Sequence, residues 1–168
     1  AADDGVEVGD MVTVRGTVTE YNGYGALGNP DQGLTELTNG SIVTHDTTDH
    51  ALPAPVVLSL EEVGQEMYEG VLVTVTGTVV EAVNDDSYGE WRMSNNLDAS
   101  DTDADTINVN DRFAVTSPLQ GTIATVTGPL NYWGGSGNSR PAWRVEPASE
   151  TDVEIACENA DLTVTIQM

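Results

Sequence analysis

One pattern of apolar and polar residues occurs three times along the chain. The copies are Gly9–Val18, Gly70–Val79 and Gly121–Leu130, and they share the motif G-x-x-[VA]-T-V-x-G-x-[VL]. Apolar and polar residues alternate in each copy, which predicts a strand with one buried face. The inner glycine of each copy falls on the apolar face, where it marks a bulge or a sharp bend. Three strands bent at an equivalent point predict a small, curled barrel.

The leading glycine of each copy is expected in the turn that precedes the strand. Further strands are predicted at residues 34–44 (with a turn at Asn39-Gly40), 90–94, 107–115, 142–146 and 161–168. Ser59 followed by Glu62 resembles a capping box, so a short helical turn is expected there.

The net charge of the chain is more informative about its function than its length. The 168 residues include 28 acidic and 5 basic ones, all five of them arginine, for a formal net charge of −23. Such a surface stays soluble in a salty medium and attracts cations, whereas it repels nucleic acid. The acidic charge and the absence of lysine lead us to expect a secreted or cell-surface protein, and the opening Ala-Ala-Asp-Asp is typical of a mature end left after cleavage. Cys157 has no second cysteine to pair with, and no apolar run approaches a membrane span.

Several stretches resemble the OB-like domains that accompany the catalytic domain of bacterial extracellular nucleases. Those similar to a complete domain are Tyr68–Glu81, Gly89–Ser94, Gly121–Tyr132 and Trp143–Pro147. Those similar to the end of a preceding domain are Glu20–Gly23 and Gly33–Leu37, separated by an insertion at 24–32, and then Leu52–Leu58. The resemblance covers about residues 1–58 and 68–154.

The resemblance implies an all-β fold with a five-stranded OB-type barrel. We expect residues 1–60 to form an N-terminal β segment resembling only the closing half of an OB domain. Residues 61–155 would form a complete OB-like barrel, and residues 156–168 a strand that pairs with a neighbouring subunit. The resemblance brings no catalytic residues, and no nucleophile motif or phosphate loop is present, so we expect a protein that is not an enzyme.

An acidic loop is the strongest candidate for a metal site. Alternating aspartates can converge on one calcium ion, as the first positions of a calcium loop do. The calcium candidates are Asp98, Asp101, Asp103 and Asp105, with Asp85 and Asp86 in a preceding turn. Thr106 and Arg112 stand where an EF-hand has glycine and glutamate, so the loop is not an EF-hand. The alternative is a solvated acidic loop without metal.

A second candidate holds both histidines of the chain. His45, Asp46, Asp49 and His50 lie within six residues, and imidazole and carboxylate groups together bind zinc or another transition metal. The spacing matches no established motif, and the alternative is an ordinary polar loop.

Aromatic and arginine residues gather near the closing hairpin. They are Tyr132, Trp133, Trp143, Arg140 and Arg144. Three roles are open: packing of the core and its rim, a protein interface, or stacking of nucleic-acid bases or sugars.

Three functions remain open from the sequence. The favoured one is a secreted structural module, stabilised by calcium, that self-associates into a filament by strand addition. Its motivation is the incomplete first half-domain together with the free strand carrying Leu162, Val164 and Ile166. The alternatives are a nucleic-acid-binding accessory module of a secreted nuclease system, which the net charge disfavours, and a glycan- or surface-binding adhesin module.

Overall fold

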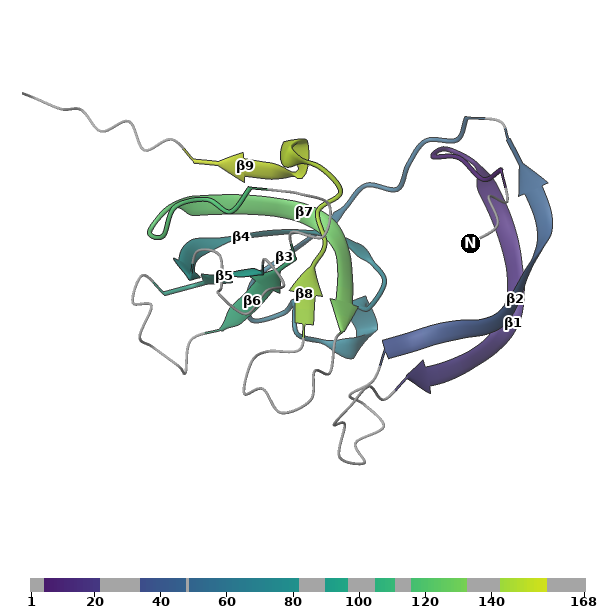
Figure 1. Cartoon of the computed structure of the whole chain (residues 1–168), viewed down its shortest axis with the longest axis horizontal. Helices are drawn as coiled ribbons and strands as arrows, with labels where there is room; N and C mark the ends of the chain where they lie inside the picture. Colours follow the sequence, from purple (N-terminus) through teal and green to yellow (C-terminus); the bar gives the residue numbers. More distant parts are fainter. Residues whose placement is uncertain are drawn as a thin grey trace, which may run out of the picture.

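A closed barrel and a long two-stranded hairpin make up the fold (Figure 1). The structure, a computed structural model, describes residues 5–21, 34–47, 49–81, 90–96, 105–110, 116–132 and 143–156. The strands are β1 (Met11–Tyr21), β2 (Leu34–Asp46), β3 (Val56–Leu58), β4 (Leu72–Glu81), β5 (Trp91–Ser94), β6 (Thr106–Val109), β7 (Ile123–Tyr132), β8 (Trp143–Val145) and β9 (Val153–Ile155). Two short 3-10 turns, η2 (Glu66–Tyr68) and η3 (Glu150–Asp152), precede β4 and β9.

Five strands close the barrel. They follow one another in the order β4, β5, β6, β8 and β7, and β7 pairs back with β4. Two short strands extend this sheet: β3 lies parallel to β4, and β9 lies antiparallel to β7. This architecture confirms the predicted all-β, OB-type fold.

The second and third copies of the motif form the central antiparallel pair of the barrel, β4 and β7. Val75 lies opposite Val126, and both occupy the sixth position of their copies. On the other face, two threonine pairs exchange hydrogen bonds at 2.8 Å: Thr74 with Thr127, and Thr76 with Thr125. Cross-strand threonine pairs of this kind stabilise a sheet, which gives the repeated threonines a structural role.

The leading glycines of the motif lie in turns, as the sequence predicts. The predicted bulge at the inner glycine is found at Gly16, where the register shifts, but β4 and β7 pair without a bulge at Gly77 and Gly128. The leading ones, Gly9, Gly70 and Gly121, have φ of +100°, +72° and +87°, a region that glycine enters without the strain other residues incur. The inner ones lie where another segment crosses closely. A Cβ added at Gly128 would lie 2.6 Å from the carbonyl oxygen of Glu146, and one at Gly77 would lie 2.8 Å from Leu60 Cδ1.

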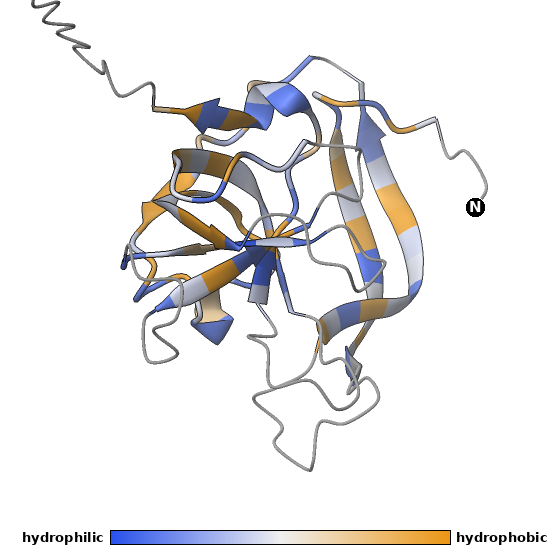
Figure 2. Cartoon of the chain, turned by 60° about the vertical axis from the view of Figure 1, so that its left-hand side comes forward, coloured by the Kyte–Doolittle hydropathy of each residue, from blue (hydrophilic) through white to orange (hydrophobic). Residues whose placement is uncertain are grey.

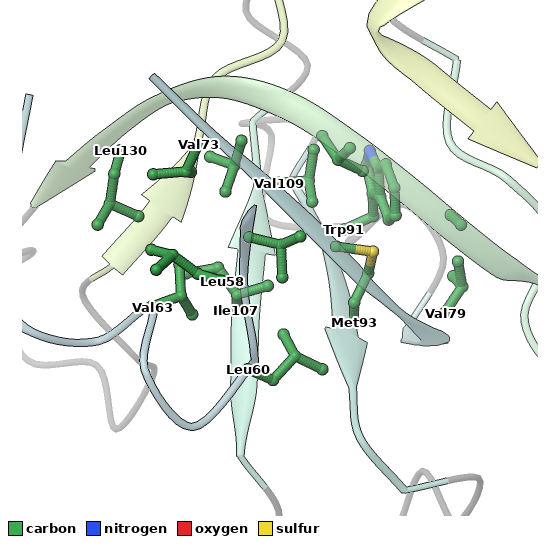
Figure 3. Close-up of a cluster of buried hydrophobic side chains, with 14 residues drawn as sticks. Leu58, Leu60, Val63, Val73, Val79, Trp91, Met93, Ile107, Val109 and Leu130 are labelled. Atoms are coloured by element: carbon green, nitrogen blue, oxygen red, sulfur yellow. The ribbon is translucent and has the colours of Figure 1, made fainter. Parts of the chain in front are cut away.

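The core of the barrel is filled by apolar side chains from every barrel strand (Figure 3). The fully buried ones with the largest volumes include Trp91, Met93, Ile107 and Leu130. Leu58, Leu60 and Val63, from β3 and the turn after it, also belong to the buried cluster. No residue of β1 or β2 belongs to this described core, so the barrel buries its apolar surface independently of the hairpin.

Several predicted elements take slightly different bounds. The predicted strand at 142–146 is β8, and the one at 90–94 is β5. The one at 107–115 is β6, which spans Thr106–Val109; Asn110 lies beyond it, and residues 111–115 lie outside the described range. The predicted helical turn is a tight turn in which the Ser59 N–H and hydroxyl donate to the Glu62 carboxylate at 3.0 and 2.9 Å.

The expected turn at Asn39-Gly40 is wrong, because β2 continues through it. Asn39 has φ +52° there, the left-handed conformation that asparagine tolerates better than most residues. The register between Arg15 and Thr17 shifts at this point, so the Asn-Gly pair forms an irregularity inside a long strand. An Asn-Gly signal alone does not distinguish a bulge from a hairpin turn.

Candidate functional site

The β1–β2 hairpin is amphipathic, and its apolar face is exposed. Val18 pairs with Leu37 and Val14 pairs with Ile42, so the four side chains share one face. Their exposed fractions are 69%, 48%, 46% and 38%, in that order. Orange and blue segments accordingly alternate along both strands in Figure 2. The alternation in the sequence predicts that this strand face is buried, but no described segment covers it.

The opposite face of the hairpin is polar and internally bonded. Thr19 and Thr38 share a hydroxyl hydrogen bond at 3.0 Å, and the Thr38 hydroxyl donates to the Thr17 carbonyl oxygen at 3.2 Å. Water can solvate this face without cost. Covering the apolar face would therefore lower the free energy of the protein, whereas covering the polar face would bring no such gain.

The extra residues of the hairpin lie on β2. Thr13 pairs with Thr44 and Val14 with Ile42, so β2 has one unmatched residue, Val43. The second irregularity lies between the pairs Arg15–Ser41 and Thr17–Thr38. There β1 has one unpaired position, Gly16, and β2 has two, Asn39 and Gly40. Strand β1 thus keeps an uninterrupted alternation of faces, and β2 carries the bulges.

Relative to the motif, β1 pairs with β2 in the same register as β7 pairs with β8. Val18 and Leu130 both occupy the tenth position of their copies; Val18 pairs with Leu37, and Leu130 pairs with Val145. Two residues later, Glu20 pairs with Thr35, as Tyr132 pairs with Trp143.

The inner glycines extend this equivalence. A Cβ at Gly16 would meet Leu37 Cγ at 2.6 Å and the Thr38 carbonyl oxygen at 2.9 Å, and one at Gly128 would meet Glu146. In the barrel, the other edge of β7 is paired with β4. The corresponding edge of β1 pairs with no strand among those the structure describes.

A carboxylate ties the hairpin to the barrel. The backbone N–H of Thr35, at the start of β2, donates to both oxygens of Glu69 at 3.1 Å. Beside this contact is an open, shallow cavity of about 320 Å³. It is lined by Leu34, Thr35, Glu69, Gly70, Pro129, Leu130, Asn131 and Glu146. On its barrel side, Glu146 accepts hydrogen bonds from the side-chain amides of Asn131 and Asn110 at 3.1 and 3.3 Å.

The histidine cluster forms two separate pairs. His45 Nε2 lies 2.7 Å from Asp10 Oδ2, and His50 Nε2 lies 3.2 Å from Asp46 Oδ2. A hydrogen bond from the Glu7 N–H, followed by the contact with His45, lowers the pKa of the Asp10 carboxyl. Asp49 lies close to Gly9. Within the described ranges, no three histidine, cysteine or acidic side chains are placed to share a metal ion, so the geometry lends the predicted transition-metal site no support.

Most of the calcium candidates fall outside the described residues, namely Asp85, Asp86, Asp98, Asp101 and Asp103. Asp105 is described and exposed. Its carboxylate accepts a hydrogen bond from the Asn95 amide at 2.9 Å, and its carbonyl accepts one from the Asn95 N–H at 3.3 Å. These bonds join the two ends of the acidic loop, and calcium binding by the loop stays a prediction.

The described members of the aromatic group are engaged within the barrel. Tyr132 is 8% exposed and meets Trp143 edge to face, with ring centroids 5.0 Å apart. Burial, with a smaller effect of Glu66, raises the pKa of the Tyr132 hydroxyl. Arg144 forms an ion pair with Glu90, and both side chains are 11% exposed. Trp133, Arg140 and the strand residues Leu162, Val164 and Ile166 lie outside the described part.

Sequence reasoning missed two of these contacts. The Thr35–Glu69 tie and the Arg144–Glu90 pair each join residues more than thirty positions apart. A weak signal existed for the second, because a chain with so few cations is expected to match each buried arginine with one of its many acids.

No protein-family model matches this chain, and no curated protein is significantly similar to it. Among the described residues, no helix has the length and apolar character needed to cross a membrane.

Proposed function

We propose that this protein is a non-enzymatic, extracellular assembly module that self-associates through its N-terminal hairpin. One observation carries the proposal: the apolar face of β1 and β2 is exposed, while the barrel beside it has a complete core of its own. An isolated two-stranded hairpin is at best marginally stable in water. A partner that covers this face gains the burial of Val14, Val18, Leu37 and Ile42 and completes the sheet at the same time.

Strand addition is the mode of association that best fits the hairpin. The outer edge of β1 presents backbone donors and acceptors to which no described strand is bonded. Unprotected edges of this kind are templates for pairing with another chain. If donor and acceptor lie on different parts of the chain, the contact is head to tail, and its repetition gives an open filament when the rotation between copies does not close a ring.

Charge sets the conditions for assembly. Two chains that each carry a formal charge of −23 repel each other at low ionic strength. The Debye length falls from about 10 Å at 0.1 M salt to about 3 Å at 1 M, so added salt removes most of this repulsion. Calcium bound by the acidic loops would make the net charge less negative and so weaken this repulsion further. Assembly is therefore expected to increase with salt and with calcium.

Analytical ultracentrifugation and electron microscopy of the full chain test the proposal. We expect a monomer at low salt and larger species or filaments at high salt with calcium. Val18→Asp, which places a charge on the apolar face, should abolish the larger species. Thr17→Asp adds the same charge to the polar face of the same strand and should leave them in place. A chain that stays monomeric at high concentration, high salt and millimolar calcium would refute the proposal.

A further inference from the structure

The barrel contains a template for the strand that is missing from the hairpin. In the barrel, β7 pairs with β4 along one edge. The pairing runs from Leu72–Pro129 to Thr78–Ile123, and its register is regular, without a bulge. This pairing places Val75 opposite Val126 and Val73 opposite Gly128. A strand equivalent to β7 therefore accepts an antiparallel strand with valines at alternate positions and threonines between them.

Strand β1 is the equivalent of β7, and none of the described strands pairs with the corresponding edge of β1. Val12, Val14 and Gly16 occupy the positions of Ala124, Val126 and Gly128 in their copies of the motif. Because the bulges of the hairpin lie on β2, the alternation of β1 is regular over the residues that would pair. Its free edge thus offers the same register as β7 offers to β4.

The last residues of the sequence match the strand that this edge accepts. Leu162-Thr163-Val164-Thr165-Ile166 repeats the alternation of Val73-Thr74-Val75-Thr76-Gly77 in β4. The segment 162–168 contains no charged residue, in a chain where one residue in five is charged. A strand without charges can approach an acidic neighbour with less repulsion than other parts of the chain.

We infer that residues 162–166 of one chain pair antiparallel with the free edge of β1 in a neighbouring copy, with Val164 opposite Val14. This inference rests on the proposed function and names its donor and acceptor. Leu162 then lies opposite Gly16, as Val73 lies opposite Gly128. Ile166 lies opposite Val12, where the template has Gly77 and Ala124. Gly77 is required in the barrel because Leu60 and Met93 crowd it, so the larger Ile166 fits only where no such side chains pack against the donated strand.

A neighbouring copy fits as donor better than the same chain does. The last described strand, β9, pairs with Ala124–Val126 of β7, on the barrel. In Figure 1 its arrow points away from β1 and β2. Donation to the next copy repeats head to tail, which is the geometry of a filament.

Disulfide trapping tests the pairing and its register. In a Cys157→Ser background, one chain carries Val14→Cys and a second, co-expressed chain carries Val164→Cys. Directly opposed residues in an antiparallel pair have Cα atoms about 4.5–5.5 Å apart, within the range that a disulfide bridges. We expect a cross-linked species of two chains on a non-reducing gel. Val14→Cys with Thr165→Cys is the matched control, because a shift of one residue turns the side chain to the other face.

The outcomes separate this inference from the proposed function. A chain that ends at Asn159 should lose assembly, while the barrel keeps its melting temperature. If that chain still assembles, or if the Val14–Val164 pair cross-links no better than the control pair, the donor is wrong although self-assembly stands. A cross-link within a single chain carrying both cysteines, without the two-chain product, would overturn donation between copies. Absence of any assembly by the native chain would remove the proposed function itself.

Discussion

Val75 of β4 and Val126 of β7 face each other at the centre of the barrel, and neither is exposed. Each is the sixth residue of its copy of the motif, so the two antiparallel copies are related by a local two-fold axis between them. On either side of this pair a glycine in one copy faces a residue with a side chain in the other, Gly77 opposite Ala124 and Gly128 opposite Val73. The inner glycines thus leave space where the barrel strands cross.

Gly128→Ala is expected to destabilise the barrel by about 1–3 kcal/mol, as overpacked cores usually are. The added Cβ would lie 2.6 Å from the Glu146 carbonyl oxygen and 2.9 Å from Pro147 N, and backbone atoms move less easily than a flexible side chain. Urea unfolding monitored by tryptophan fluorescence measures the change. Gly64→Ala is the control, since its Cβ would meet Trp143 at an ordinary 3.6 Å. Equal stability of the two variants would contradict this account of Gly128.

Breaking the Arg144–Glu90 ion pair is expected to cost about 3–5 kcal/mol, because Glu90→Leu removes a carboxylate from beside a guanidinium that is only 11% exposed. Adding Arg144→Met to Glu90→Leu should recover most of this loss, since it removes the second charge from the interior. The control is Glu81→Gln at the more exposed Arg92–Glu81 pair, where a loss of about 1 kcal/mol or less is expected. Thermal and urea unfolding of the native chain, the two single variants and the double variant measure these changes in stability. A double variant no more stable than Glu90→Leu would show that the pair acts in another way.

Stability is expected to fall as the pH drops below about 4.5, because folding lowers the pKa of Glu62 and Glu150, whose carboxylates accept hydrogen bonds in the fold. Hydrogen bonds from the N–H and hydroxyl of Ser59 lower the pKa of Glu62 from its ordinary 4.5, and bonds from the Thr116 hydroxyl and N–H do the same for Glu150. A carboxyl with a lowered folded pKa stabilises the fold above its unfolded pKa, and the contribution disappears as the pH falls through the folded pKa. Glu62→Gln with Glu150→Gln should therefore flatten the dependence of unfolding free energy on pH below 4.5. Above pH 6 the two curves should run parallel, and a steeper acid slope in the variant would contradict the assignment.

Calcium is expected to raise the melting temperature of the chain, and a chelator to reverse the effect. Free calcium at a hundred times its dissociation constant would stabilise the fold by about 2.7 kcal/mol. Asp101→Asn with Asp103→Asn should abolish the response, because it removes two carboxylates from the predicted loop. Glu154→Gln, which removes one exposed carboxylate on β9, should leave the response unchanged. An identical calcium response in the loop variant and the native chain would place the effect elsewhere on the acidic surface.

The repeated motif made much of the barrel predictable from sequence. Alternation identified β4 and β7 and their inward faces, and the leading glycines indicated the turns, whereas the close contacts at the inner glycines Gly77 and Gly128 were not predicted. Two short strands, β3 and β9, were not assigned as strands, because three residues give too little alternation to distinguish a strand from an extended loop. Asn39 and Gly40 were misassigned for a related reason: the same dipeptide suits a hairpin turn and a bulge, and the long pairing of β1 with β2 decides between them.

The candidate surface was predictable only in part. The sequence indicates that β1 has an apolar face, since Val12, Val14 and Val18 alternate with polar residues, but alternation normally means that the face is buried. Its exposure depends on which strands are present to cover it, which is a property of the whole fold. Contacts such as Thr35 with Glu69 depend on where the hairpin lies against the barrel, and local sequence does not encode that position.

The Glu69 tie has a mechanical consequence. Within the described residues, the hairpin contributes nothing to the barrel core, and hydrogen bonds from the Thr35 N–H to the Glu69 carboxylate join it to the barrel, beside an open cavity. A fibre made of such subunits would have rigid barrels joined by compliant junctions, so its bending stiffness would depend on this contact more than on the strength of the cores. Replacing Glu69 would be expected to leave the fibre intact and make it more pliable.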